Sequence, residues 1–197
     1  DTLSLHDALP ILYQTVTIGT QCWMKENLQT TRYNDGTVIP YEGDRIAWFR
    51  STNGAWCLYD NDVNNSLLYG KLYNWQAVNT GKLAPVGWHV PTEAEWTTLI
   101  TFLGGNAGDK MRNNNYWLPS SWVNNTNSSG FTALPNGYFY VDATITPIGY
   151  SAKFWSSTQN NSSVGLAKYC FLYFQNSDAR IQNQGLGHGM SIRCIKD

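Results

Sequence analysis

The chain has 197 residues, which is enough for one sizeable domain with its own apolar core. Charged residues make up only 14% and the formal net charge is −1, so no basic field exists to attract nucleic acid or an acidic membrane face. No run of about eighteen apolar residues occurs, so no membrane insertion by this segment is expected. The 9 Trp and 12 Tyr, set among many Asn and Ser residues, are typical of extracellular recognition surfaces.

The first residues need separate treatment. Residues 1–11, DTLSLHDALPI, resemble the in-frame translation of a sequencing-adapter oligonucleotide. We therefore expect a single folded domain over residues 12–197 and leave His6 out of the candidate site residues.

The first half of the domain contains two predicted strands and a predicted helix. Alternation at Val16 and Ile18 predicts a short strand, and residues 23–28 form a second extended piece. Residues 34–66 are rich in Asn, Asp, Gly and Ser and are predicted to be mostly loop. The segment YGKLYNWQAV, residues 69–78, has apolar side chains at helical spacing.

A second helix is predicted to begin directly after Thr92. Thr92 is a favourable N-cap, Glu95 completes a capping box, and Glu93 lies in the first turn, where a helix favours negative charge. Gly104 and Gly105 end the helix. Its apolar stripe consists of Trp96, Leu99, Ile100 and Leu103.

The second half of the chain is predicted to form short strands separated by turn residues. The predicted strands cover residues 130–134, 137–141, 151–156, 167–174, 179–182 and 191–195. Two helices followed by many strands indicate an α+β fold, with the two helices packed on short, mostly antiparallel strands.

The stretch GWHVPTEAEW places His89 beside two carboxylates, which raises the possibility of a metal or acid–base site. Both carboxylates already have a role in the helix start, and the His89 ring need not face either of them. A metal site also needs at least three converging ligands. We therefore interpret the stretch as scaffold, with structural roles for Trp88, His89, Thr92, Glu95 and Trp96.

The segment DNDVNN begins like a calcium-binding loop. It departs from the EF-hand pattern because Asn65 replaces the glycine and Lys71 replaces the final glutamate. A different calcium loop using Asp60, Asp62 and Asn64 remains an alternative to an ordinary turn, which is favoured. No nucleotide-binding or nucleophile motif occurs, so neither a catalytic residue nor a cofactor is expected.

Four widely spaced cysteines, Cys22, Cys57, Cys170 and Cys194, form no C-x-x-C motif. Zinc-ribbon and thioredoxin-like sites are therefore not expected. Two disulfides with three possible connectivities, or four buried thiols, both remain open.

The C-terminal third concentrates amide, hydroxyl and aromatic side chains between short strands. Such loops on a rigid scaffold can form a binding face, although they can also be ordinary soluble loops. Arg180 would supply forked donors and Tyr173 a stacking surface. The candidate contact residues are Gln159, Asn160, Asn161, Tyr173, Asn176, Arg180, Asn183 and His188.

Six motifs in order, TIGTQCWMKENLQTTRYNDGTVIP, YGKLYNWQAV, GWHVPTEAEWTTLI, SGFTALPNGY, AKFWSST and GMSIRCIKD, resemble the Fibrobacter succinogenes major paralogous domain (FISUMP). The resemblance implies a C-type-lectin-like fold in secreted or surface proteins of Bacteroidota and relatives. It also implies framework roles for Trp155 and Cys194. Ala84-Pro85 stands where the family commonly has Cys-Pro, and the family cysteine near residues 65–66 is missing, so at least one family disulfide is not expected here.

The resemblance and the C-terminal residues together predict a non-catalytic, extracellular or cell-surface module that binds a glycan or protein ligand. Calcium-dependent lectin motifs are missing, so calcium-mediated sugar binding does not follow from the fold. Three alternatives remain: a variable protein of a diversity-generating retroelement, a purely structural surface module, and an oxidase of the formylglycine-generating type using Cys170 and Cys194. No oligomeric state follows from the sequence.

Overall fold

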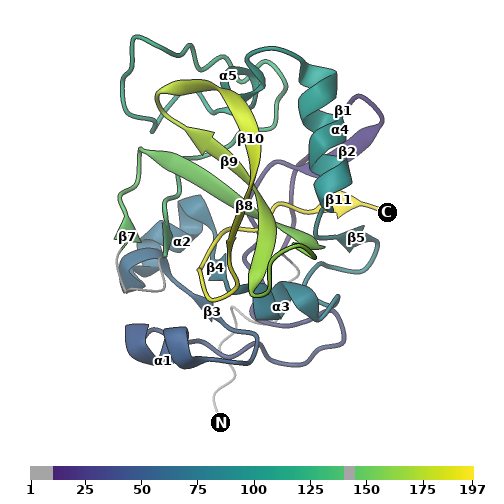
Figure 1. The fold of residues 1–197 in the computed structure, drawn as a ribbon, viewed down its shortest axis with the longest axis vertical. Helices are drawn as coiled ribbons and strands as arrows, with labels where there is room; N and C mark the ends of the chain where they lie inside the picture. The colour runs from purple at the N-terminus through teal and green to yellow at the C-terminus, as the bar shows by residue number, and fades with distance from the viewer. Residues whose placement is uncertain (1–10, 140–144) are drawn as a thin grey trace.

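The computed structural model describes residues 11–139 and 145–197 and combines antiparallel sheets with short helices (Figure 1). The four-stranded sheet has the order β1–β2–β11–β5, with strands Thr15–Ile18, Gln21–Met24, Ile195–Lys196 and Trp88–His89. The three-stranded sheet has the order β10–β9–β8, with strands Asn176–Gly185, Leu166–Tyr173 and Ser151–Gln159. Two small sheets pair β3 (Trp56–Cys57) with β4 (Leu72–Tyr73) and β6 (Tyr138–Phe139) with β7 (Ile145–Thr146).

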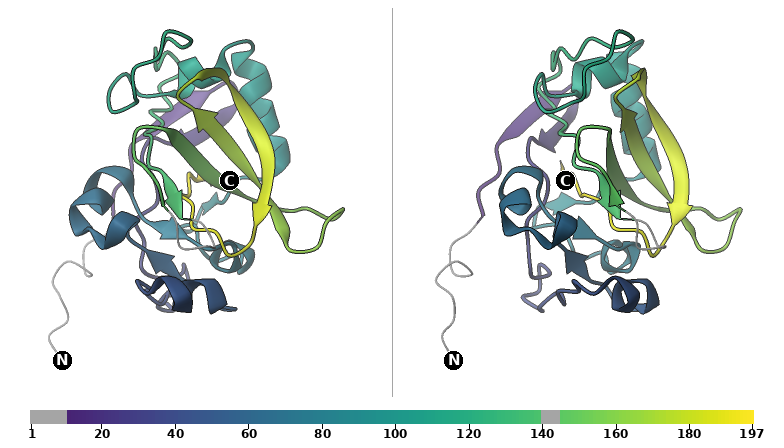
Figure 2. Two further views of the ribbon diagram at one scale, coloured as in Figure 1. Left: turned by 60° about the vertical axis from the view of Figure 1, so that its left-hand side comes forward. Right: turned by 90° about the vertical axis from the view of Figure 1, so that its left-hand side faces the viewer.

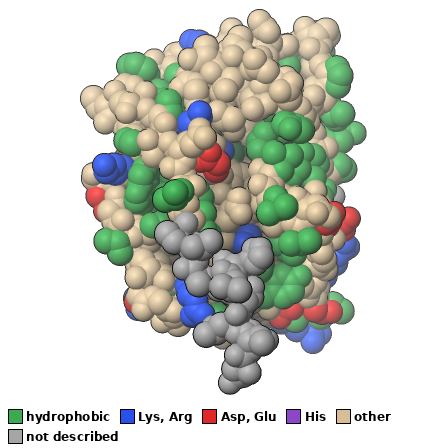
Figure 3. Space-filling model, turned by 180° about the vertical axis from the view of Figure 1, so that it is seen from behind, with side chains coloured by type: hydrophobic (Ala, Val, Ile, Leu, Met, Phe, Trp, Pro, Cys, Tyr) green, Lys and Arg blue, Asp and Glu red, His purple; other side chains and the backbone are tan. Residues whose placement is uncertain are grey.

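Five α-helices occur in the described part of the chain. They are α1 (Arg45–Arg50), α2 (Val63–Tyr69), α3 (Trp75–Asn79), α4 (Glu93–Leu103) and α5 (Ala107–Met111), and a short 3-10 turn covers Tyr59–Asn61. In Figures 1 and 2, α4 and α5 lie beside the upper part of the three-stranded sheet, and α1 and α3 lie below it. The back of the molecule carries several apolar patches with charged side chains scattered among them (Figure 3). No helix in residues 11–139 or 145–197 is long and apolar enough to cross a membrane.

The three-stranded sheet is buried on both faces over much of its area. Phe154 and Leu172 point into the apolar cluster that contains Trp96 of α4. Trp155 and Tyr169, on the opposite face, belong to a second apolar cluster. Alternation along each strand therefore sends neighbouring residues into two different cores.

The predicted helix start at Thr92 is confirmed. The Thr92 hydroxyl accepts a hydrogen bond from the Glu95 amide at 3.2 Å, and the Thr92 amide donates to Glu95 Oε2 at 2.7 Å. Gly104, at φ +67°, follows the last helical residue. Trp96 is fully buried, and its ring centroid lies 4.7 Å from that of Trp23.

The prediction of mostly loop over residues 34–66 holds for the larger part of this segment, but it missed α1, β3, the 3-10 turn and the start of α2. Asp44 caps α1 by accepting hydrogen bonds from two backbone amides, and Asp62 caps α2 by accepting one from the Asn64 amide. Trp48 anchors α1 with 1% exposure. Two of the polar residues on which the loop prediction rested are therefore helix caps. The helices were also missed because each is too short to show a clear apolar periodicity.

The helix predicted over residues 69–78 is shorter than expected, because it begins only at Trp75. Asn74 interrupts it, because its Oδ1 accepts from the Ala77 amide at 3.1 Å and from the Ala55 amide at 2.9 Å. The residues before Asn74 form β4, and α3 starts at Trp75.

Three of the predicted C-terminal strands are confirmed: residues 151–156 form the first part of β8, residues 167–174 nearly coincide with β9, and residues 179–182 lie within β10. Residues 130–134 form only a single bridge, between Ala133 and Arg112, and the last strand begins only at Ile195. The segment 137–141 contains β6, and its last two residues lie outside the described residues. Residues 1–10 of the expected adapter segment also lie outside them.

Candidate functional site

The eight candidate contact residues do not form one cluster. Gln159, Asn160 and Asn161 lie where β8 turns into β9, whereas Tyr173 and Asn176 lie where β9 turns into β10. These are opposite ends of the same sheet, separated by the length of β9, about 25 Å at strand rise. A single ligand of monosaccharide size cannot contact both groups.

The two candidates on β10 point to opposite faces of the sheet. Arg180 pairs with Phe171 in the register, and Asn183 pairs with Lys168. Residues an odd number of positions apart on a strand face opposite sides. Asn183 therefore lies on the α4 side, where the Lys168 amine is 3.0 Å from a Glu93 oxygen, and Arg180 lies on the other side.

His188 and Asn176 are held by local contacts. His188 is only 6% exposed, and its Nδ1 lies 3.0 Å from the Gly185 carbonyl oxygen. Asn176 Oδ1 accepts from the Asp178 amide at 2.9 Å. Both side chains thus take part in shaping loops.

One face of the three-stranded sheet brings cations and aromatic rings together. Lys153, Phe171 and Arg180 lie side by side across β8, β9 and β10. The Tyr173 ring lies 6.0 Å from that of Phe171 at 25°, and Gln182 neighbours Arg180 on the same face. We call these five residues, Lys153, Phe171, Tyr173, Arg180 and Gln182, the sheet-face site.

Lys153 is the most unusual member of the sheet-face site. It is 4% exposed, and its amine lies 3.3 Å from the centroid of the Tyr138 ring and 4.9 Å from that of Tyr169. Cation–π attraction of this kind favours the charged amine. Burial nevertheless lowers the pKa of Lys153 to about 7, so the charge of the site changes near neutral pH.

Polar contacts fix the remaining members. The Tyr169 hydroxyl donates to Gln182 Oε1 at 2.6 Å, which orients the amide. Arg112, fully buried, donates to the carbonyl oxygens of Tyr173 and Asn176 at 2.9 and 2.7 Å. Arg112 thereby ties α5 to the β9–β10 turn. The residues expected from the sequence did not include Lys153, Phe171, Gln182 or Arg112, although alternation along the predicted strand 167–174 places Phe171 on the same face as Tyr173.

The expectation that the His89 ring need not face the neighbouring carboxylates is wrong for Glu95. Its Nε2 lies 2.8 Å from Glu95 Oε1, and its Nδ1 lies 2.6 Å from Asp197 Oδ1. Glu93 instead contacts Lys168. The ring can donate to a carboxylate from each nitrogen only as an imidazolium, so these two contacts favour the protonated form of His89. We call this pair of contacts the His89 clip; it joins β5 to the start of α4 and to Asp197, the residue after β11.

The clip predicts a pH-dependent stability. Burial lowers the pKa of His89, but the bonds and charges of Asp197 and Glu95 outweigh it, so the net pKa is raised. The stabilisation is then complete below the ordinary value near 6.5 and is lost as the pH rises through the folded-state pKa. The urea midpoint of the wild type should exceed that of His89→Gln by more at about pH 5.5 than at about pH 8.5. An equal difference at both pH values would contradict the clip.

The other structural candidates are buried to different degrees. Trp155 is fully buried, and its Nε1 donates to the Tyr73 carbonyl oxygen at 2.9 Å. Trp88 is half-buried and packs against the apolar cluster that contains Cys194.

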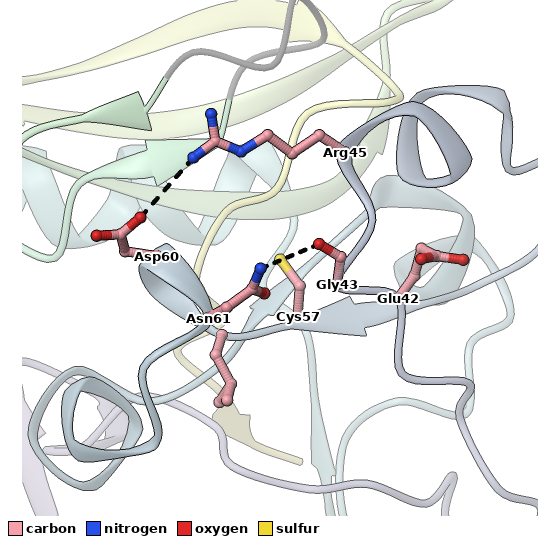
Figure 4. A pocket seen from close by; sticks show the side chains of 7 residues that line it. Glu42, Gly43, Arg45, Cys57, Asp60 and Asn61 are labelled. Carbon is pink, nitrogen blue, oxygen red and sulfur yellow. Dashed lines mark hydrogen bonds and ion pairs between the residues drawn. The ribbon is translucent and has the colours of Figure 1, made fainter.

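The candidate calcium loop uses its oxygens for local contacts. Asp60 points toward Arg45, 3.7 Å away, in a small hollow that Cys57 also lines (Figure 4). Asp62 Oδ1 accepts from the backbone and side chain of Asn64 at 2.9 and 3.0 Å. Within the described residues no group of three His, Cys, Asp or Glu side chains is placed to hold a metal.

The four cysteines are free thiols. Cys170 and Cys194 are fully buried and belong to different apolar clusters, one on each side of the sheet. Burial raises the pKa of Cys170, and it raises the pKa of Cys194 to about 12 despite the opposing effect of Arg193. Neither thiol is ionised at neutral pH, and the two do not form a disulfide.

These features define a mixed α/β domain with antiparallel sheets, free cysteines and a cation–aromatic sheet face. The model of the Fibrobacter succinogenes major domain matches residues 16–196, and the chain belongs to this family. No curated protein and no solved structure matches the chain.

Proposed function

We propose that the chain is a non-catalytic recognition module of a secreted or surface-displayed bacterial protein, with a C-type-lectin-like fold, that binds an extracellular glycan or protein. Its binding surface is the sheet-face site. The observation that supports this proposal is the side-by-side placement of Phe171 and the exposed Arg180 on β9 and β10, with the Tyr173 ring beside Phe171, while the buried Lys153 on β8 contributes charge rather than surface.

The chemistry of the sheet-face site suits recognition. The partly exposed rings of Phe171 and Tyr173 offer apolar faces to a sugar or a side chain. Arg180 is exposed and forms no ion pair within the described part of the chain, so its forked donors can meet ligand oxygens. The rigid strands hold these groups in place before binding, which lowers the entropy that binding costs.

The proposal predicts binding that depends on Phe171 and Arg180. The 197-residue chain is applied to arrays of glycans and surface proteins, with calcium and again with EDTA. Phe171→Ala combined with Arg180→Gln should weaken binding to each array ligand that lacks a carboxylated sugar at least about tenfold, a loss of about 1.4 kcal/mol or more. The matched control, Phe102→Ala with Arg50→Gln, removes an exposed ring and an exposed cation elsewhere and should bind as the wild type.

The array distinguishes the alternatives. Binding that survives EDTA agrees with a calcium-free site on the sheet. Binding lost in EDTA would instead implicate the loop with Asp60, Asp62 and Asn64 and contradict the sheet-face assignment. An absence of any ligand on either array would favour a purely structural module.

A further inference from the structure

A second surface hollow lies in the N-terminal half of the chain, away from the sheet-face site. It has a volume of about 370 Å³, within the range of small-molecule sites. Its lining consists of Thr31, Arg32, Val38, Ile39, Tyr41 and Trp56. The Tyr41 and Trp56 ring centroids are 4.8 Å apart and the rings meet at 55°, so they form an aromatic corner. We call this hollow the Tyr41–Trp56 groove.

Hydrogen bonds hold the two rings of the corner. Trp56 Nε1 donates to the Ile39 carbonyl oxygen at 3.0 Å, and the Tyr41 hydroxyl donates to Asn61 Oδ1 at 3.1 Å. The Tyr41 side chain nevertheless remains 49% exposed. Exposed aromatic surface that is fixed in position is a binding platform, because little entropy is lost when a ligand covers it.

The backbone around the groove is equally fixed. Arg32 and Val38 form an antiparallel bridge, and Tyr41 forms a parallel bridge with Trp56. The Trp56 amide donates to the Pro40 carbonyl oxygen at 3.0 Å. The two walls therefore do not need to rearrange for a ligand to enter.

The groove has a positive charge at its rim. Arg32 is the one ionisable side chain in its lining other than Tyr41, and it forms no ion pair among the described residues. The Lys71 amine lies 5.0 Å from the Trp56 ring centroid. The nearby acids are engaged elsewhere: Asp35 pairs with Lys82, and a Glu42 oxygen accepts from the Asp44 amide. The local charge therefore favours an anionic ligand.

We propose that the Tyr41–Trp56 groove binds a carboxylated sugar residue. The apolar face of the sugar ring lies against the aromatic corner, and its carboxylate accepts hydrogen bonds from the Arg32 guanidinium, which matches a carboxylate in geometry. Thr31 borders the same hollow and offers a hydroxyl to the ring oxygens. This site is separate from the sheet-face site and does not depend on the function proposed for it.

Calorimetric titration tests the proposal with two probes, trigalacturonate and a tetrasaccharide of alternating glucuronate and N-acetylglucosamine. At least one probe should bind the 197-residue chain at a single site. Its methyl ester, which keeps the rings but loses the charge, should bind at least about tenfold more weakly. Arg32→Gln should weaken binding of the acid by a similar factor and leave binding of the ester unchanged. Tyr41→Ala should weaken both.

Matched variants separate this site from general effects. Arg50→Gln removes another exposed arginine and Phe49→Ala another exposed ring, and both should bind as the wild type. The sheet-face double variant should also bind the acidic sugar normally. No binding of either probe, equal affinity for acid and ester, or loss of binding in the sheet-face variant would each overturn the proposal. Tighter binding of a hexaglutamate peptide would overturn the sugar assignment as well.

Discussion

Replacing Arg112 with methionine is expected to lower the free energy of unfolding by about 3–5 kcal/mol, the usual cost of breaking a buried ion pair. Arg112 is fully buried, and its guanidinium contacts the buried Asp109 carboxylate. It also donates to Asn125 Oδ1 at 2.6 Å and to the Tyr173 carbonyl oxygen at 2.9 Å. The variant leaves Asp109 buried without its cation and the β9–β10 turn without its tether.

Urea unfolding of three variants checks this expectation. Asp109→Asn removes the opposite charge but can keep the bond from the Asn124 amide to Oδ2. The double variant, Arg112→Met with Asp109→Asn, should cost clearly less than the sum of the single changes, because no charge remains buried alone. A cost of Arg112→Met below about 1 kcal/mol, or strict additivity, would contradict the role of the pair.

Arg112→Met should affect ligand binding as well as the free energy of unfolding. Because Arg112 holds the carbonyl oxygens of Tyr173 and Asn176, its loss should also weaken ligand binding at the sheet-face site at temperatures where the domain is still folded. Arg112 acts there as a positioning residue. Binding that stays at the wild-type level in the folded variant would show that the turn does not position Tyr173 for the ligand.

Replacing Arg193 with methionine is expected to cost about 3 kcal/mol of unfolding free energy. Arg193 is fully buried and donates to Asn27 Oδ1 at 3.1 and 2.7 Å and to the carbonyl oxygens of Met24 and Phe131 at 3.2 and 2.5 Å. Each buried acceptor left without a donor costs roughly 1–3 kcal/mol. Part of that cost is offset, because the methionine variant no longer has to bury a guanidinium. This burial is unfavourable, and it lowers the pKa of Arg193 to about 9.

The controls for Arg193 separate hydrogen bonding from charge. Arg193→Lys keeps a positive charge but cannot reproduce the fork, so it should be at least as destabilising as Arg193→Met. Lys196→Met, at an exposed neighbouring position, should change stability by no more than about 0.5 kcal/mol. If Arg193→Lys unfolds at the wild-type urea concentration, the hydrogen bonds of Arg193 are not what stabilises this core.

Local sequence signals predicted the parts of the fold that depend on local physics. The capping box at Thr92 and Glu95 needs only three residues of chain, and it is present as expected. Three C-terminal strands were predicted from the turn residues that separate them, and they are present as β8, β9 and β10. The family resemblance, which rests on ordered motifs, is confirmed over residues 16–196.

The parts that failed depend on contacts distant in the sequence. Asp197 reaches His89 across 108 positions, and nothing near His89 indicates it. Arg193 reaches Asn27 across 166 positions, so a buried role for this arginine could not be predicted locally. The candidate contact residues were chosen by composition, which does not say that Arg180 and Asn183 face opposite sides of β10.

The most direct test of the sheet-face site is to map where a bound ligand lies. Backbone chemical shifts of the 197-residue chain are followed by NMR during titration with the tightest-binding array ligand that lacks a carboxylated sugar. The largest saturating shifts should occur at Phe171, Tyr173, Arg180 and Gln182, and Phe171→Ala with Arg180→Gln should abolish them. Saturating shifts confined to the β8–β9 turn at residues 160–165, with none on the face of β9 and β10, would contradict it.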